Sequence, residues 1–212
     1  MLLYLMRHGE TDWNVQRRIQ GISGTPLNER GYLQARALAE TLRGKLVTAV
    51  YSSHLLRARQ TAGIIAETLG LEVRPEPRLA ELDQGELEGF TTEEIEARYN
   101  GFMEDWRNRP ATLRMPGGEN LAELQERAWS ALEDLRILHP DDTIAAVSHN
   151  LAISAILCRA LGIDLNGFRR IRQFNAASNL VEYSPTRGWN VVIMNSLAHL
   201  KGITATEGSP YL

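Results

Sequence analysis

Short apolar runs that alternate with amphipathic stretches are the feature of this sequence that most constrains its fold. The apolar runs have the length and continuous hydrophobicity of strands that are buried in a sheet. We expect strands at residues 2–6, 45–53, 71–77, 142–150, 179–184 and 189–195. Helical patterns predict helices at residues 28–44, 54–70, 121–138 and 151–162. This alternation predicts an α/β protein in three layers, with a mainly parallel central sheet flanked by helices.

Capping residues predict where two of these helices begin or end. Asn28 has the residue type of an N-cap, and Gly44 is expected to end the same helix. Gly70 is expected to end the following helix, because glycine readily adopts the left-handed conformation found after a last helical turn. The boundaries of the first two helices are therefore predicted from local chemistry alone.

The chain has 212 residues, which is enough for one sizeable hydrophobic core. We expect a single domain over residues 1–212. Residues 83–118 include prolines and glycines and show little apolar periodicity, and we expect them to form a small insertion that caps an active site. Within the insertion, Thr91 and Glu94 have the spacing of a capping box for a short helix.

Polar residues follow three of the predicted strands at the point where each strand ends. Arg7 and His8 follow the first strand, Arg57 lies one helical turn beyond the second, and His149 follows the fourth. Parallel strands place their carboxyl ends along one edge of a sheet, where α/β proteins bind their ligands. Two guanidinium groups, two imidazoles and free helix N–H groups suit a dianionic phosphoryl group.

One of these imidazoles could act as a nucleophile. A neutral imidazole that attacks phosphorus divides a difficult displacement into two easier steps through a phosphohistidine. Glu81, in the loop after the third strand, is the candidate proton donor for the leaving oxygen. We interpret His54, His139 and His199 as ordinary polar residues outside the site.

Composition and motifs exclude several other classes of protein. The formal charge of −3 predicts neither a nucleic-acid nor a membrane partner, and we expect a cytoplasmic protein without a signal peptide. The single cysteine, Cys158, is expected to be buried and structural. No metal-binding motif or glycine-rich phosphate loop is present, so we expect neither a metal nor another cofactor.

The roles of the surface arginines stay open at this point. Arg17, Arg18 and the arginines at 169–172 are expected to be solvent-exposed. Arg107, Arg109 and Arg114 flank the predicted cap, where they could either face solvent or bind an anionic part of a substrate.

Several motifs together resemble the histidine phosphatase superfamily, in its phosphoglycerate-mutase-like branch. They are RHGETDWN, IQGISGTPLNERGYLQARALAETL, VYSSHLLRARQTA, ELDQGELEG, GGEN and AVSHN, in the order expected for the family, and the ending NSLAHL is common in its small phosphatases. The resemblance implies a phosphohistidine mechanism without metal. By position it implies His8 as nucleophile and Glu81 as proton donor. It implies a phosphate pocket and a substrate-lining segment made of Arg7, Arg57, His149, Asn14, Gln20 and Gly21.

Within that family, the sequence favours a phosphatase over a cofactor-dependent phosphoglycerate mutase. The chain reads GISGTPL and AELDQGELEG where the mutases usually carry GWxDxxL and ERHYG. We expect a small phosphorylated metabolite as the substrate, with phosphoserine, alpha-ribazole phosphate and broad specificity as equal alternatives. The mutase is the second hypothesis, and a catalytically inactive phospho-ligand binding module is the third.

A homodimer is possible.

Overall fold

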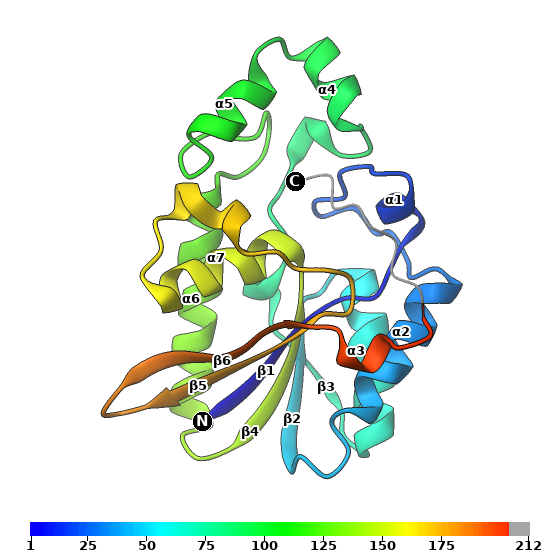
Figure 1. Cartoon of the computed structure of the whole chain (residues 1–212), viewed down its shortest axis with the longest axis vertical. Helices are drawn as coiled ribbons and strands as arrows, with labels where there is room; N and C mark the ends of the chain where they lie inside the picture. The colour runs from blue at the N-terminus through cyan, green and yellow to red at the C-terminus, as the bar shows by residue number, and fades with distance from the viewer. Residues whose placement is uncertain (204–212) are drawn as a thin grey trace.

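The fold is built on one six-stranded mixed sheet, described here from a computed structural model that defines residues 1–203 (Figure 1). Its strands are β1 (Leu2–Arg7), β2 (Val47–Ser52), β3 (Val73–Pro75), β4 (Thr143–Ser148), β5 (Ser178–Ser184) and β6 (Gly188–Ser196). The strand order is β3-β2-β4-β1-β5-β6. The first four strands of that order are parallel, whereas β5 runs antiparallel to β1 and forms a hairpin with β6. The predicted α/β architecture with a mainly parallel sheet is confirmed.

The helices cover both faces of this sheet. They are α1 (Asp12–Val15), α2 (Glu29–Glu40), α3 (Leu56–Leu69), α4 (Thr92–Arg98), α5 (Phe102–Asn108), α6 (Leu121–Leu138) and α7 (Asn150–Leu161). Short 3-10 turns are η1 (Pro77–Leu79), η2 (Gly85–Leu87), η3 (Leu165–Arg170) and η4 (Ala198–Leu200). Helices α2 and α3 pack together on one face, and α6 and α7 pack together on the other (Figure 1).

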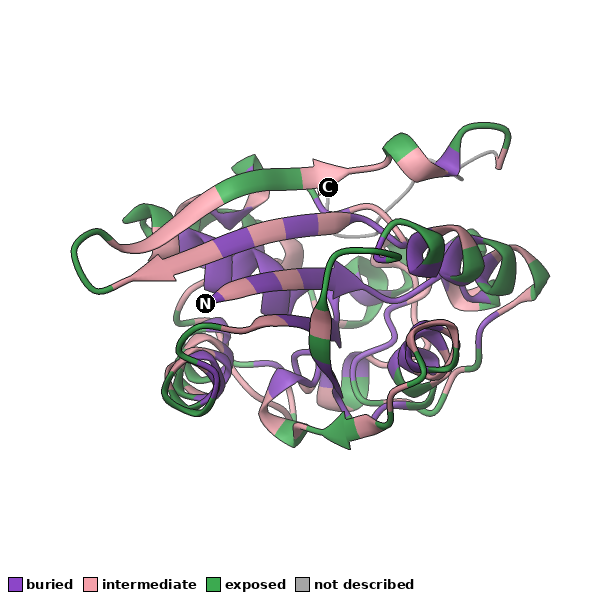
Figure 2. Ribbon diagram, turned by 90° about the horizontal axis from the view of Figure 1, so that it is seen from below, coloured by how far each residue is buried: buried purple, intermediate pink, exposed green. Residues whose placement is uncertain are grey.

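Side chains along β1 alternate between two hydrophobic cores. Leu3 and Leu5 belong to the core under α6 and α7, whereas Met6 belongs to the core under α2 and α3, with Tyr4 packed against it. This follows from the two-residue period of a strand, which turns successive side chains to opposite faces. The central strands β1, β2 and β4 are buried over most of their length, up to their carboxyl ends (Figure 2). Cys158 of α7 is buried as predicted.

Most of the predicted helix boundaries are confirmed, and one is wrong. Asn28 caps α2 by accepting from the backbone N–H of Gly31, and Gly70 ends α3 with φ at +69°. Helix α2 nevertheless ends at Glu40 rather than at Gly44. After Glu40 the backbone N–H groups of three successive residues, 41 to 43, donate to the carbonyls three residues earlier, at 3.0 to 3.3 Å. This last turn is therefore tighter than an α-helix.

The predicted insertion at 83–118 contains η2, α4 and α5 and stands beyond the carboxyl ends of the strands (Figure 1). The capping box of Thr91 and Glu94 begins α4 as predicted. Helix α5 was not predicted. It follows Gly101 without a side-chain cap. Its Trp106 packs against Phe168, and this contact between distant residues could not be predicted from the local sequence. Within residues 1–203, no helix is long and apolar enough to cross a membrane.

Candidate active site

His8 lies directly after β1 and is almost completely buried. Its Nδ1 is 2.6 Å from the carbonyl oxygen of Gly9, which can only accept a hydrogen bond, so Nδ1 carries the ring proton. Its Nε2 receives a hydrogen bond from Nε of Arg57 at 3.2 Å. The two contacts agree on one neutral tautomer, in which Nε2 holds a lone pair.

The surroundings of His8 keep its imidazole neutral. Burial lowers the pKa of His8 well below its usual value, and the positive charges of Arg57 and Arg7 lower it further. The hydrogen bond to Gly9 opposes this shift without reversing it. A neutral ring with a lone pair on Nε2 is the form of histidine that can attack an electrophile.

The two arginines are held in place by backbone carbonyl groups. Arg7 donates from Nη1 to the carbonyl of Gln173 at 2.5 Å. Arg57 donates to the carbonyls of Gly21 at 2.7 Å and of Ser23 at 2.9 Å. Both guanidinium groups are nearly inaccessible to solvent. The hydrogen bonds restrict the rotation of both side chains, so the positive charge beside His8 is fixed in place.

Strand register brings the second histidine to the same place. Arg7 of β1 pairs with Ser148 of β4, so the residues that follow each strand lie side by side. The ring centroids of His8 and His149 are 5.1 Å apart. Nε2 of His149 is hydrogen-bonded to Oγ of Ser53, which follows β2, at 2.6 Å.

His149 is also held in its neutral form. Burial lowers the pKa of His149 well below its usual value, and the charge of Arg57 contributes next. Its Nδ1 has no hydrogen-bond partner within the described part of the chain. The sequence predicted the meeting of His149 with His8 but assigned no role to Ser53.

Glu81 reaches the site from the loop between η1 and η2. Its carboxylate accepts hydrogen bonds from the backbone N–H groups of Leu151 and Ala152, both at 3.2 Å, and from Leu82 at 3.0 Å. It thus occupies the N-terminus of α7, where the helix dipole favours negative charge. Glu81 and the two arginines open onto one small pocket. That pocket is lined by Arg7, His8, Asn14, Arg18, Gln20, Arg57 and Glu81.

The three predicted substrate-contacting residues have different positions. Asn14 lines the pocket, and its Oδ1 accepts from the side chain of Asn175 at 3.0 Å. Gln20 also lines the pocket and accepts from the Thr11 hydroxyl at 2.9 Å. Gly21 acts through its carbonyl oxygen, which holds Arg57. Asn175 follows η3 far along the chain, and no sequence signal connected it with this site.

Arg18 corrects a prediction, because it was expected to be solvent-exposed. Its Nη1 donates to the carbonyl of Gly89 at 2.6 Å and pairs with Glu94 of α4 at 3.0 Å. The side chain is 35% exposed and is one of the residues that line the small pocket. Arg169 was also expected at the surface, but its Nη2 donates to the carbonyl of Trp106 at 2.8 Å and its guanidinium packs over the ring of Trp106. In both cases the partner comes from a distant segment.

An open cleft of about 460 Å³ adjoins the small pocket and shares Glu81 with it. Its lining carries both signs of charge. The charged and titratable lining residues are His54, Glu81, Asp83, Arg114, Glu119, Glu123 and Arg127. Of the three arginines predicted to flank the cap, Arg114 lines the cleft and pairs with Glu123, whereas Arg109 pairs with Asp105 at 2.9 Å.

The remaining histidines lie outside the small pocket. His139 is bonded to Asp142 at 2.6 Å and to the Tyr51 hydroxyl at 2.9 Å, and His199 to the carbonyl of Ala176 at 3.0 Å. Across residues 1–203, no group of three or more histidine, cysteine, aspartate and glutamate side chains is arranged to hold a metal ion.

A mainly parallel sheet whose carboxyl edge gathers two neutral histidines and two buried arginines defines an α/β protein with a candidate anion site. Comparison with known families makes this more specific. The family model described as histidine phosphatase superfamily (branch 1) matches residues 3–196. The chain belongs to that superfamily, as its motifs had indicated.

Relatives and solved structures within the superfamily carry several names. The chain is 36% identical over 202 residues to a protein of Enterobacter sp. (strain 638) named "Probable phosphoglycerate mutase GpmB", covering 93% of this chain and 94% of that protein. A mycobacterial glucosyl-3-phosphoglycerate phosphatase, solved with VO3, has a TM-score of 0.84 and 30% identity over 92% of this chain and 99% of that one.

Two further solved structures are similar in fold. A phosphoserine phosphatase mutant from Entamoeba histolytica in complex with phosphoserine has a TM-score of 0.82 and 27% identity, covering 94% of this chain and 98% of that chain. A "putative alpha-ribazole-5'-P phosphatase" from Escherichia coli has a TM-score of 0.85 and 26% identity, covering 92% and 96%. Phosphatase and mutase names therefore both occur among the proteins similar to this chain.

Proposed function

We propose that this protein is a metal-independent phosphomonoesterase that works through a phosphohistidine on His8. The observation that carries the proposal is the neutral tautomer of His8, whose Nε2 lone pair lies beside the guanidinium of Arg57. Arg7 lines the same pocket. A dianionic phosphoryl group placed there would meet a nucleophile and two fixed cations at once.

In the first step, the Nε2 lone pair of His8 attacks phosphorus, and the bond between phosphorus and the ester oxygen breaks. Arg7, Arg57 and His149 stabilise the negative charge on the phosphoryl oxygens. Glu81 enters this step protonated and gives its proton to the leaving oxygen. The carboxylate that forms is stabilised by the N–H groups of Leu151 and Ala152 at the start of α7.

In the second step, water attacks the phosphohistidine and the bond between phosphorus and Nε2 breaks. The Glu81 carboxylate takes the proton of the attacking water, which returns it to its protonated form. Inorganic phosphate leaves, and His8 regains its neutral ring. The cycle consumes one water for each ester and needs neither metal nor redox partner.

The open cleft beside Glu81 is the proposed place for the organic part of the substrate. Its mixed charge favours a small, polar phosphorylated metabolite over a purely apolar one. Phosphoserine and other polar monoesters fit that description, and alpha-ribazole phosphate is the most apolar of the candidates. The similarity to phosphatases that are named for several different substrates supports a hydrolase without choosing its substrate.

A phosphate-release assay in EDTA tests the proposal. The substrates are phosphoserine, 3-phosphoglycerate, alpha-ribazole phosphate and p-nitrophenyl phosphate, each with and without 2,3-bisphosphoglycerate. We expect phosphate release that needs neither metal nor the bisphosphate. Inactivity in EDTA that added metal restores would overturn the metal-independent mechanism.

A cofactor-dependent phosphoglycerate mutase is the second candidate. It is favoured by the 36% identity to a protein named as a probable phosphoglycerate mutase. The same residues would serve, but the phosphoryl group would return to another hydroxyl instead of water. Interconversion of 3- and 2-phosphoglycerate that depends on the bisphosphate, without net phosphate release, would identify the mutase.

A further inference from the structure

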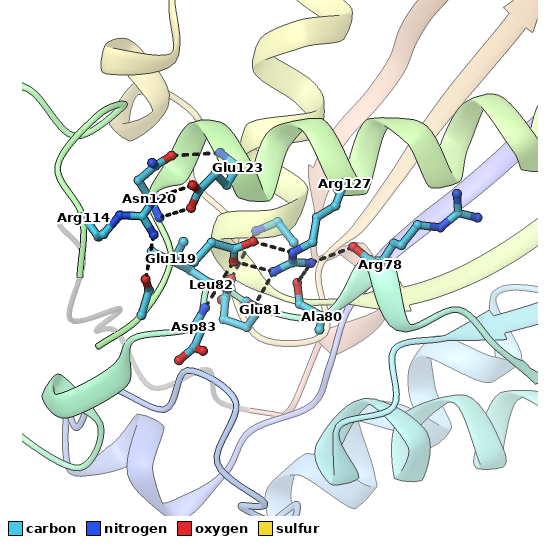
Figure 3. A network of polar contacts seen from close by, with 12 residues as sticks. Arg78, Ala80, Glu81, Leu82, Asp83, Arg114, Glu119, Asn120, Glu123 and Arg127 are labelled. Atoms are coloured by element: carbon cyan, nitrogen blue, oxygen red, sulfur yellow. Dashed lines mark hydrogen bonds and ion pairs between the residues drawn. The ribbon is translucent and has the colours of Figure 1, made fainter. Parts of the chain in front are cut away.

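The side chain of Arg127 extends from α6 to the loop that carries Glu81 (Figure 3). Its Nη1 donates to the carbonyls of Arg78 at 2.7 Å and Ala80 at 2.9 Å, and its Nη2 donates to the carbonyl of Glu81 at 2.8 Å. The carbonyl of the intervening residue, Leu79, accepts from the Ser148 hydroxyl at 2.7 Å. Four consecutive carbonyls of this loop are thus bound by side chains.

Glu119 holds Arg127 and the same loop from the other side (Figure 3). Its two carboxylate oxygens accept from Nε of Arg127 at 2.7 Å and from Nη2 at 2.8 Å, which is the bidentate arrangement of a guanidinium and a carboxylate. Its backbone N–H donates to the carbonyl of Asp83 at 3.0 Å. The loop is therefore fixed at both ends of the segment that contains Glu81.

The contacts of Arg127 account for every N–H group that a guanidinium has. An arginine offers five donors, and these five hydrogen bonds go to three backbone carbonyls and one carboxylate. Arg127 lines the open cleft but has no donor left for a ligand. Its role in the reaction is consequently exerted through the residues that it binds.

We infer that Arg127, with Glu119, is a positioning residue that sets the place of Glu81 relative to His8. The inference rests on the proposed function, because it assumes that Glu81 protonates the leaving group. The Glu81 carboxylate is bound to the start of α7, whereas its backbone is bound to α6 through Arg127. Loss of Arg127 would free the backbone and leave three carbonyls without a partner, so the loop would shift.

A pair of substrates with a similar ring but different leaving groups separates this role from general support of the fold. Benzyl phosphate releases an alkoxide and needs a proton, whereas p-nitrophenyl phosphate releases a stable phenolate and needs little protonation. The ratio of the two kcat/KM values is measured on one preparation, so the fraction of folded enzyme cancels. The variants are Arg127→Met, Arg127→Lys and Glu119→Gln.

Arg136→Met is the matched control. Arg136 lies on the same helix, and its side chain is 28% exposed against 25% for Arg127. It pairs with Glu133 and packs over the ring of Tyr183, instead of binding the Glu81 loop. Arg127→Lys retains the charge and tests the geometry, because an ammonium group offers three donors from one atom. Glu119→Gln removes the ion pair while keeping a side chain of similar size.

We expect Arg127→Met to lower kcat/KM for benzyl phosphate by about 10²-fold and that for p-nitrophenyl phosphate by less than about threefold. Arg127→Lys and Glu119→Gln should shift the ratio in the same direction, and Arg136→Met should leave it unchanged. Equal losses on both substrates in all three variants, while Glu81→Gln remains selective, would overturn the inference and leave the proposed function standing. A wild-type protein that releases phosphate from neither ester would count against the proposed function itself.

Discussion

Nε of Arg57 lies 3.2 Å from Nε2 of His8 and donates to its lone pair. Burial lowers the pKa of the imidazole, and a permanent cation in this place lowers it further and keeps the ring neutral. The same cation also stands where phosphoryl oxygens would be bound. The same guanidinium is tied to the carbonyls of Gly21 and Ser23, so the loop after Gln20 determines its position. The Arg57 side chain therefore both keeps the proposed nucleophile neutral and supplies positive charge for the phosphoryl group.

Removal of the proposed nucleophile gives the most direct test. His8→Ala is expected to reduce phosphate release by about 10⁴-fold or more, because it removes the nitrogen on which the proposed covalent intermediate forms. His139→Gln is the control, since His139 is bonded to Asp142 and Tyr51 at the other end of β4 and lines neither the small pocket nor the cleft. Circular dichroism checks that both variants fold. Near-normal turnover of His8→Ala would end the phosphohistidine mechanism.

Replacement of the proposed acid should depend on the leaving group. Glu81→Gln keeps the size of the side chain but removes the transferable proton, so alkyl phosphates should lose about 10²-fold or more in kcat/KM. p-Nitrophenyl phosphate should lose far less, because its leaving group is already stable. Steady-state rates on both substrates provide the measurement, and equal losses would argue against Glu81 as the acid.

The stability of the protein is expected to fall as the pH drops below about 6.5, the usual pKa of histidine. Burial and Arg57 lower the pKa values of His8 and His149, so the folded state keeps both rings neutral while the unfolded chain protonates them. The unfolded state then binds more protons, and the free energy of unfolding falls by up to about 1.4 kcal/mol per pH unit for each histidine.

Urea unfolding at about pH 7.5 and about pH 5.5 measures this slope in the wild type and in His8→Gln. The variant should show a shallower decline, by as much as the contribution of one histidine. Other titrating groups are common to both proteins, so the difference reports on His8. Identical slopes would show that the ring of His8 is protonated in the folded state as readily as in the unfolded chain.

Two glycine substitutions are expected to have opposite effects. A Cβ on Gly31 would overlap the carbonyl oxygen of Glu10, a backbone atom that cannot move independently, so Gly31→Ala should cost about 1–3 kcal/mol. Gly63 lies inside α3, and apart from its chain neighbours and the backbone of its own helix no atom lies within 4 Å of such a Cβ. Gly63→Ala should therefore stabilise the protein by about 0.5–1 kcal/mol. Thermal unfolding of the two variants provides the comparison.

Local signals in the sequence determined which segments become strands and helices. Asn28, Gly70 and the Thr91–Glu94 pair each act on backbone groups within a few residues, so their effects could be predicted from residue type and spacing. The meeting of His8 with His149 was also predictable, because parallel strands bring their carboxyl ends to one edge. Helix α5 lacked such a signal and was missed.

Only the tertiary structure decided which polar side chains support the site. Arg127 looked like any charged residue on an amphipathic helix, but it binds the carbonyl of Glu81, 46 residues earlier in the chain. Arg18 and Asn175 likewise meet their partners, Glu94 and Asn14, across long stretches of sequence. Such contacts depend on how helices and loops pack against the sheet, and residue spacing along the chain does not predict that packing. The sequence alone therefore determined the helices, the strands and the reactive residue types. The packing of distant segments determined which side chains hold those reactive residues in place.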